Sequence, residues 1–191
     1  MTRISHLISF TILLLVSLQI KGQDLEFYRE DIVFDIHGDS AYVDALYYFC
    51  NVGDKDIRLS LFYPFPEGTR SLIDSIRTED VVSQSVIPHR DGNSGIFFEI
   101  SVRPYAQSAY RVFYRQKLED RHFKYILTST STWRRPLDFA NYRFQIPQED
   151  SVHCLSIQPD TTFIEDHSRL FLWHRKDFMP EKDFEVFLEG F

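Results

Sequence analysis

The segment TWRRP contains the residue types best suited to recognition. Trp133 offers a flat apolar surface, and Arg134 and Arg135 offer bidentate hydrogen-bond donors. This combination is enriched at recognition surfaces and at sugar or anion sites. Tyr105, in the loop PYAQSAY, adds a further aromatic side chain to this candidate binding site. The alternative is that Trp133 caps the end of the core while the two arginines pair with some of the 28 acidic residues.

Catalytic motifs are missing from the sequence. There is no G-x-S-x-G, HExxH, P-loop or GxGxxG pattern. The acidic doublets consist of immediate neighbours, whereas glycosidase acids face each other across a cleft at about 5 to 9 Å. The doublets are Glu79–Asp80, Glu119–Asp120, Glu149–Asp150 and Glu165–Asp166. We therefore predict a protein that is not an enzyme and that has no cofactor, although distant acids could still meet in the fold.

The histidines do not form a metal-binding pattern. None occurs in an H-x-H or H-x3-H pair. Glu165, Asp166 and His167 are adjacent, with His174 seven residues on, and adjacent residues of an extended chain point to opposite faces. His89 belongs to the segment PHRDGNSG, which is typical of a hairpin turn. No metal site is predicted.

Cys50 and Cys154 are the only two cysteines, and each lies within a segment that we expect to be a strand. An oxidising compartment would allow a disulfide between them. The bond also requires Cα atoms within about 7 Å of each other. Alternatively, each is a free thiol that packs as a small core residue.

Residues 1–22 are typical of a signal peptide. Arg3 forms a positive n-region, an apolar h-region follows, and Gly22 is a small residue at which a peptidase could cleave. The uncharged run from Leu7 to Ile20 has 14 residues, fewer than the roughly 20 that a membrane-spanning helix needs. We therefore expect an exported protein, periplasmic or extracellular, with no transmembrane segment after cleavage.

Composition restricts the class of the mature chain. The whole chain has 191 residues, 18 Phe, 10 Tyr and a net charge of −7. So many aromatic residues can form a core, and the acidic balance disfavours nucleic-acid binding. Residues 23–191 fit one domain. If the chain does divide, the polar segment KLEDRH at 117–122 is the best boundary, although a hairpin tip would also explain it.

Apolar residues alternate with polar ones along much of the chain. Examples are Ile57 to Tyr63, Ile96 to Val102 and Tyr142 to Ile146. Such spacing indicates strands with one buried face. No segment has convincing helical periodicity, so we predict an all-β, mostly antiparallel two-sheet β-sandwich, immunoglobulin-like or VIT-like. The segment STWRRPLDFA, residues 131–140, interrupts the alternation and is expected to be a loop or a single helical turn.

The expected strands are separated by turn signals. They cover residues 25–37, 41–51, 57–64, 72–77, 81–87, 95–103, 109–117, 123–130, 141–147, 151–158, 169–175 and 183–189.

Two segments resemble known proteins. The run YYFCNVGDKDIRLSLFYPFPEGT, residues 47–69, resembles the opening of VIT-type β-sandwich domains. The run YILTSTSTWRRPLDFANYRFQIP, residues 125–147, is similar to a pattern in uncharacterised exported bacterial β-sandwich proteins. The resemblance implies a sandwich fold and no catalytic residue.

These observations favour an exported, non-catalytic binding or interaction module of the bacterial cell envelope. Its partner would be a protein or a glycan held by loops. Two alternatives remain: a small hydrolase acting on cell-surface polymers, and a structural subunit that pairs through an edge strand.

Overall fold

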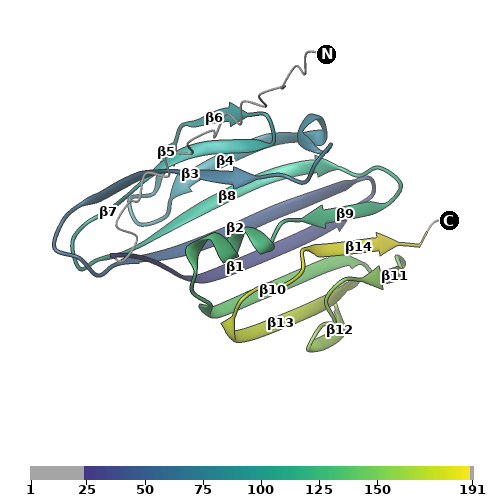
Figure 1. Cartoon of the computed structure of the whole chain (residues 1–191). Coiled ribbons are helices and arrows are strands. Elements are labelled where there is room, and N and C mark those ends of the chain that lie inside the picture. The colour runs from purple at the N-terminus through teal and green to yellow at the C-terminus, as the bar shows by residue number, and fades with distance from the viewer. Residues whose placement is uncertain (1–23, 190–191) are drawn as a thin grey trace, which may run out of the picture.

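Three β-sheets in two layers make up the part of the chain that the computed structural model describes, residues 24–189. The eight-stranded sheet forms one layer, and two three-stranded sheets lie on one of its faces (Figure 1). The predicted signal peptide, residues 1–22, lies outside the described residues. No helix within residues 24–189 is long and apolar enough to span a membrane.

The eight-stranded sheet has the order β12-β13-β10-β1-β2-β8-β4-β5. Its strands are β1 (Leu25–His37), β2 (Ser40–Asn51), β4 (Ile73–Asp80), β5 (Ser85–Ile87), β8 (Gln107–Lys117), β10 (Leu137–Pro147), β12 (Thr161–Glu165) and β13 (Ser168–Phe178). β1 pairs with β10 in parallel. The other pairings among the described strands are antiparallel.

The small sheets have the orders β3-β7-β6 and β11-β14-β9. Their strands are β3 (Ile57–Pro64), β6 (His89–Gly92), β7 (Gly95–Val102), β9 (His122–Tyr125), β11 (Val152–Leu155) and β14 (Phe184–Leu188). Two short 3-10 helices complete the fold, η1 (Arg70–Leu72) and η2 (Thr128–Trp133).

The core lies between the two layers and follows the alternation of the sequence. Along β1, Ile32, Phe34 and Ile36 are at most 1% exposed, whereas Val33 on the opposite face is 37% exposed. Phe34 stacks on Phe184 of β14 at a centroid distance of 4.4 Å. Period-2 patterning therefore supplies the inner face of the large sheet, and aromatic side chains join it to the second layer.

The prediction of an all-β, mostly antiparallel fold is confirmed. The structure has three sheets, however, where the sequence predicted two. The second layer is divided because β3 and β9 are edge strands that do not pair with each other. Strands β6 and β12 were not predicted. β6 pairs with β7 in the segment that was expected to be only a turn, and β12 consists wholly of exposed residues, which lack an alternating burial signal.

The segment around Trp133 also differs in part from expectation. A helical turn is present as η2, but it begins at Thr128, and β10 already begins at Leu137. The polar segment at 117–122 connects β8 of the large sheet to β9 of a small sheet. It is therefore a crossover between layers, not the tip of a hairpin.

Replacing Phe34 by Ala is expected to lower the free energy of unfolding by about 3–5 kcal/mol, because the substitution leaves a cavity between the layers. Val33→Ala, one residue away on the exposed face, should cost less than about 1.5 kcal/mol. Urea unfolding followed by circular dichroism measures both values. Equal losses for the two variants would contradict the assignment of the inner face.

Candidate functional site

A cavity of about 80 Å³ opens to solvent where the two small sheets meet over β1 and β2. Residues of five strands and of η2 surround it, so the split in the second layer creates it. Its lining is mainly aromatic, with one acidic residue. The lining residues are Phe27, Glu30, Tyr47, Phe49, Leu61, Phe62, Tyr63, Pro64, Phe98, Tyr125, Ile126, Ser129, Thr130 and Trp133.

Glu30 is the acidic residue of the cavity, and the phase of β1 places it there. It precedes Ile32 and Phe34 on the inward-facing positions and is only 3% exposed. A bulge between Phe27 and Arg29 lets Phe27 face inward as well. The hydroxyl of Tyr142 on β10 donates a hydrogen bond of 2.5 Å to the Glu30 carboxyl.

Burial raises the pKa of Glu30 to about 7, because the charged form loses its hydration. The hydrogen bond from Tyr142 acts in the opposite direction, and the nearby charge of Asp31 adds to the increase. Near neutral pH the carboxyl is therefore divided between its neutral and ionised forms. A carboxyl in this state within a cavity is a recognised sign of a functional site.

Three tyrosines close the gap between the edges of the small sheets. The Tyr63 hydroxyl on β3 donates to the Tyr125 hydroxyl on β9 at 2.9 Å. The Tyr47 hydroxyl on β2 forms a hydrogen bond with the same Tyr125 oxygen. Burial raises the pKa of all three phenols well above the ordinary value of 10. The three hydroxyls therefore remain protonated at physiological pH and bond to one another.

The opposite wall of the cavity is apolar. The rings of Phe27 and Phe49 stack with their centroids 5.2 Å apart. The indole of Trp133 tilts against both rings, at 5.7 Å from Phe27 and 5.4 Å from Phe49. This wall presents aromatic surface to any ligand in the cavity.

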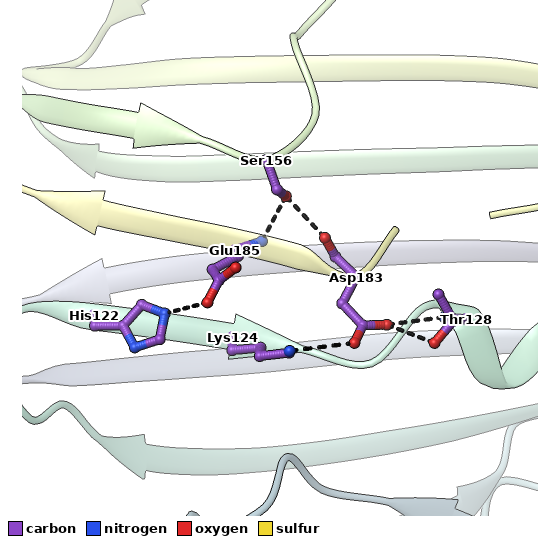
Figure 2. Close-up of polar contacts among 6 residues, drawn as sticks. All are labelled: His122, Lys124, Thr128, Ser156, Asp183 and Glu185. Atoms are coloured by element: carbon purple, nitrogen blue, oxygen red, sulfur yellow. Dashed lines mark hydrogen bonds and ion pairs between the residues drawn. The ribbon is translucent and has the colours of Figure 1, made fainter. Parts of the chain in front are cut away.

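Helix η2, which carries Trp133, is held by Asp183 (Figure 2). The Asp183 carboxylate accepts hydrogen bonds from the backbone amide and the hydroxyl of Thr128, at 3.1 and 2.7 Å. Lys124 lies 3.5 Å from the same carboxylate. Burial alone would raise the pKa of Asp183, but the Thr128 hydrogen bonds and Lys124 lower it. The first turn of η2 is thereby fixed to the segment that leads into β14.

Further contacts in Figure 2 hold that segment itself. The Ser156 hydroxyl donates to the Asp183 carbonyl oxygen and accepts from the Glu185 amide, both at 2.8 Å. A ring nitrogen of His122 lies 2.8 Å from the Glu185 carboxylate. These polar groups connect β9, β14 and the residue after β11. They fix the position of Asp183, which in turn binds Thr128 of η2.

Of the four binding residues predicted from the sequence, Trp133 alone lines the cavity. Arg135 is half-buried and pairs with Glu26 at 2.5 Å and with Asp138 at 2.8 Å. Arg134 is exposed. Tyr105 is 75% exposed in the turn between β7 and β8. The indole of Trp133 thus packs against the core and Arg135 pairs with acids, and the role of these residues in binding stays a prediction.

The two cysteines are free thiols in this structure. Cys50 lies on β2 of the large sheet and Cys154 on β11 of a small sheet. Cys154 is exposed and Cys50 is partly buried. The disulfide that the sequence allowed is not formed here.

A polar network covers part of the outer face of the large sheet. The Asn141 side chain donates to the Asp31 carboxylate at 2.6 Å, and its oxygen lies 2.5 Å from a ring nitrogen of His174. An open depression of about 380 Å³ includes these three residues. Within residues 24–189, no group of three or more His, Cys, Asp and Glu residues could hold a metal ion.

Glu30 was not among the predicted site residues, although the sequence contains a signal for it. Glu30, Ile32, Phe34 and Ile36 occupy alternate positions of one strand, so the glutamate continues an apolar row. An acidic residue in phase with a buried row is the pattern of an inward-facing carboxyl. Tyr47, Tyr63 and Tyr125 lie on three strands that are distant in sequence, so only the fold shows that they meet at the cavity.

No protein-family model and no curated protein matches the chain. A solved structure of a "putative nutrient binding protein" from Legionella pneumophila is similar, with a TM-score of 0.72 at 13% identity. The match covers 86% of this chain and 67% of that one. It supports the β-rich fold, and no family match supports the VIT resemblance.

Similarity to M1 zinc metallopeptidases is weaker. A two-domain enzyme mutant bound to L-tryptophan gives a TM-score of 0.51 at 11% identity, with 86% of this chain and 43% of that chain covered. An enzyme from Deinococcus radiodurans gives 0.48 at 11% identity, with 79% and 39% covered. The chain thus spans about two fifths of these proteins, and the likeness concerns the fold alone.

The stability of the protein is expected to depend on the protonation of Glu30. The native state keeps a proton between pH 4.5 and about 7 that the unfolded state has released. Retention of this proton stabilises the native state relative to the unfolded state. The stabilisation is fully present below about pH 4.5 and is lost as the pH rises through the native-state pKa of about 7. It amounts to about 3 kcal/mol.

Urea unfolding at pH 5 and pH 8 measures this loss. Glu30→Gln keeps a neutral side chain at both pH values, so its free energy of unfolding should fall about 2.5 kcal/mol less than that of the wild type over this range. The pH dependence of Glu30→Gln reports all other titrating groups, so the difference between the two proteins isolates Glu30. An identical pH dependence in the two proteins would show that Glu30 is not the group concerned.

Proposed function

We propose that the protein is a β-sandwich binding module that is exported to the bacterial cell envelope, and that the cavity around Glu30 and Trp133 is its binding site. The observation that carries this proposal is a solvent-open cavity that combines aromatic walls with a buried carboxyl group. Ligand sites in proteins are typically concave and apolar with a few placed polar groups. Export rests on residues 1–22 of the sequence.

The similar Legionella protein is named a putative nutrient binding protein, which agrees with this proposal. The ligand would be a small molecule, or a group that a protein or glycan partner inserts into the cavity. Trp133 would contact it from η2, while Arg134 and Tyr105, both exposed, would be available to the rest of a larger partner.

Binding has more support than hydrolysis at this cavity because no second carboxyl group and no histidine stands beside Glu30 among the described residues that line it. Glu30 faces the interior beside Tyr142, whereas His174 is exposed and follows the buried Trp173 on β13. They cannot act on one bond. The structural-subunit alternative depends on an edge strand of the large sheet, β12 or β5.

Filling the cavity is expected to abolish ligand binding. Ser129 lines the cavity from η2, and Ser129→Phe would place a ring inside it. Ser131→Phe, on the same helix at an exposed position, is the matched control. A thermal-shift screen of amines, amino acids, sugars and short peptides measures binding. At 100 times its Kd, a ligand adds about 2.7 kcal/mol, or about 5–10 °C in Tm.

The expected result is a compound that raises the Tm of the wild type and of Ser131→Phe but not that of Ser129→Phe. Circular dichroism at low temperature verifies that both variants are folded. A ligand that stabilises all three proteins equally would place the binding site elsewhere. The absence of any stabilising compound would contradict the proposal.

Export is tested by the N-terminus of the mature protein. Expressed with its own N-terminus in a bacterial host, the exported protein should lack residues 1–22, because the apolar segment is short and is followed by Gly22. Intact-mass measurement of the exported fraction gives the mass directly. Recovery of a chain that still begins at Met1 would count against a cleaved signal peptide.

A further inference from the structure

We propose that the cavity binds the alkylammonium head group of a small organic cation, with Glu30 as its counter-ion and the surrounding aromatic rings as its walls. This inference rests on the proposed function, because it names the ligand class of the same cavity. Three properties of the cavity support it: its charge, the surface that its rings present, and its size.

The first property is the charge. Glu30 is 3% exposed, and its carboxyl accepts a hydrogen bond from Tyr142. No ion pair to Glu30 is found among the described residues, and no Lys, Arg or His is among the described residues that line the cavity. A buried carboxylate without a cation is costly. A cationic ligand would supply the missing charge, whereas an anion would be repelled.

The second property is the aromatic surface. Phe27, Phe49 and Trp133 contact one another, and Tyr47 lies against Phe27 with centroids 5.8 Å apart. The faces of such rings attract ammonium groups, and cages of several rings recognise methylated ammonium ions. A sugar would need several free donors and acceptors instead. The phenol hydroxyls facing the cavity already bond to one another through Tyr125.

The third property is size. One water molecule needs about 10–15 Å³ of such a cavity, so about 80 Å³ holds roughly five to eight non-hydrogen atoms. It therefore accommodates a head group and not a whole nucleoside or disaccharide. The remainder of a longer ligand would leave through the open side beside Phe62, which is 45% exposed. The chain's net charge of −7 would favour the approach of cations.

Binding of choline, measured by isothermal titration calorimetry at pH 8, tests the proposal. The uncharged carbon isostere 3,3-dimethylbutan-1-ol has nearly the same shape, so it isolates the contribution of the positive charge. We expect choline to bind at least tenfold more tightly than the isostere. Equal affinities would overturn the role of charge.

Glu30→Gln provides the corresponding change in the protein. The variant should bind choline at least tenfold more weakly while its affinity for the isostere stays unchanged. Glu99→Gln removes one charge at an exposed position of β7 and should behave like the wild type. A loss of choline binding that is equal in both variants would reduce the effect to net charge and would overturn the proposal.

The pH dependence adds an independent readout. Choline affinity should rise from pH 5.5 to pH 8 in the wild type but not in Glu30→Gln, because only the ionised carboxyl attracts the cation. The titratable groups that influence Glu30 are Tyr142 of β10, Tyr47 of β2 and Tyr125 of β9 on its own side of the sheet, and the charge of Asp31 on the opposite face of β1. The pKa of each tyrosine is raised above 10 and that of Asp31 is lowered, so none of them titrates in this range.

Two further probes define the ligand and separate the two proposals. Tetramethylammonium binding more tightly than methylammonium would indicate a quaternary head group, and the reverse order would indicate a primary amine. If neither these ions nor choline bind, while another compound raises the Tm in a manner that Ser129→Phe abolishes, the cation proposal fails and the proposed function stands. If nothing binds in the cavity, both fail.

Discussion

The burial of one carboxyl group against a tyrosine hydroxyl is the interaction on which the site depends. Glu30 continues the inward-facing row of β1, so the central strand of the fold cannot form without bringing this carboxyl between the layers. Tyr142, on the parallel neighbour β10, supplies a hydrogen bond but no charge. The fold therefore contains a polar group whose ionised form is unfavourable unless something else enters the cavity.

The division of the second layer explains why a cavity is present at that point. A continuous sheet over β1 and β2 would cover Glu30 completely. Instead, the edges β3 and β9 approach each other without backbone pairing and are joined through the hydroxyls of Tyr63 and Tyr125. Side-chain bonds between edges leave gaps that backbone ladders do not, and η2 only partly covers the gap. The anchoring of Thr128 by Asp183 sets the position of this cover.

Much of the fold could be predicted from the sequence, because alternation reports which face of a strand is buried. It indicated β1, β3 and β7 within one or two residues of their bounds. It failed for β12, whose residues are all exposed, and it could not reveal that the second layer is split. Of the residues predicted as a binding site, only Trp133 lines the candidate cavity. The prediction relied on residue types in a loop, whereas the cavity depends on tyrosines from β2, β3 and β9 that are distant in sequence.

The cost of Glu30 is itself an argument for function. Structural roles for buried polar groups are usually filled by side chains that are fully paired within the protein. A glutamine at this position could accept the same hydrogen bond from Tyr142 without the penalty of ionisation near neutral pH. What glutamine cannot provide is a negative charge at the base of an aromatic cavity. The feature that separates Glu30 from its neutral isostere is therefore its ability to hold a cation, and the aromatic walls around it are suited to the same ion.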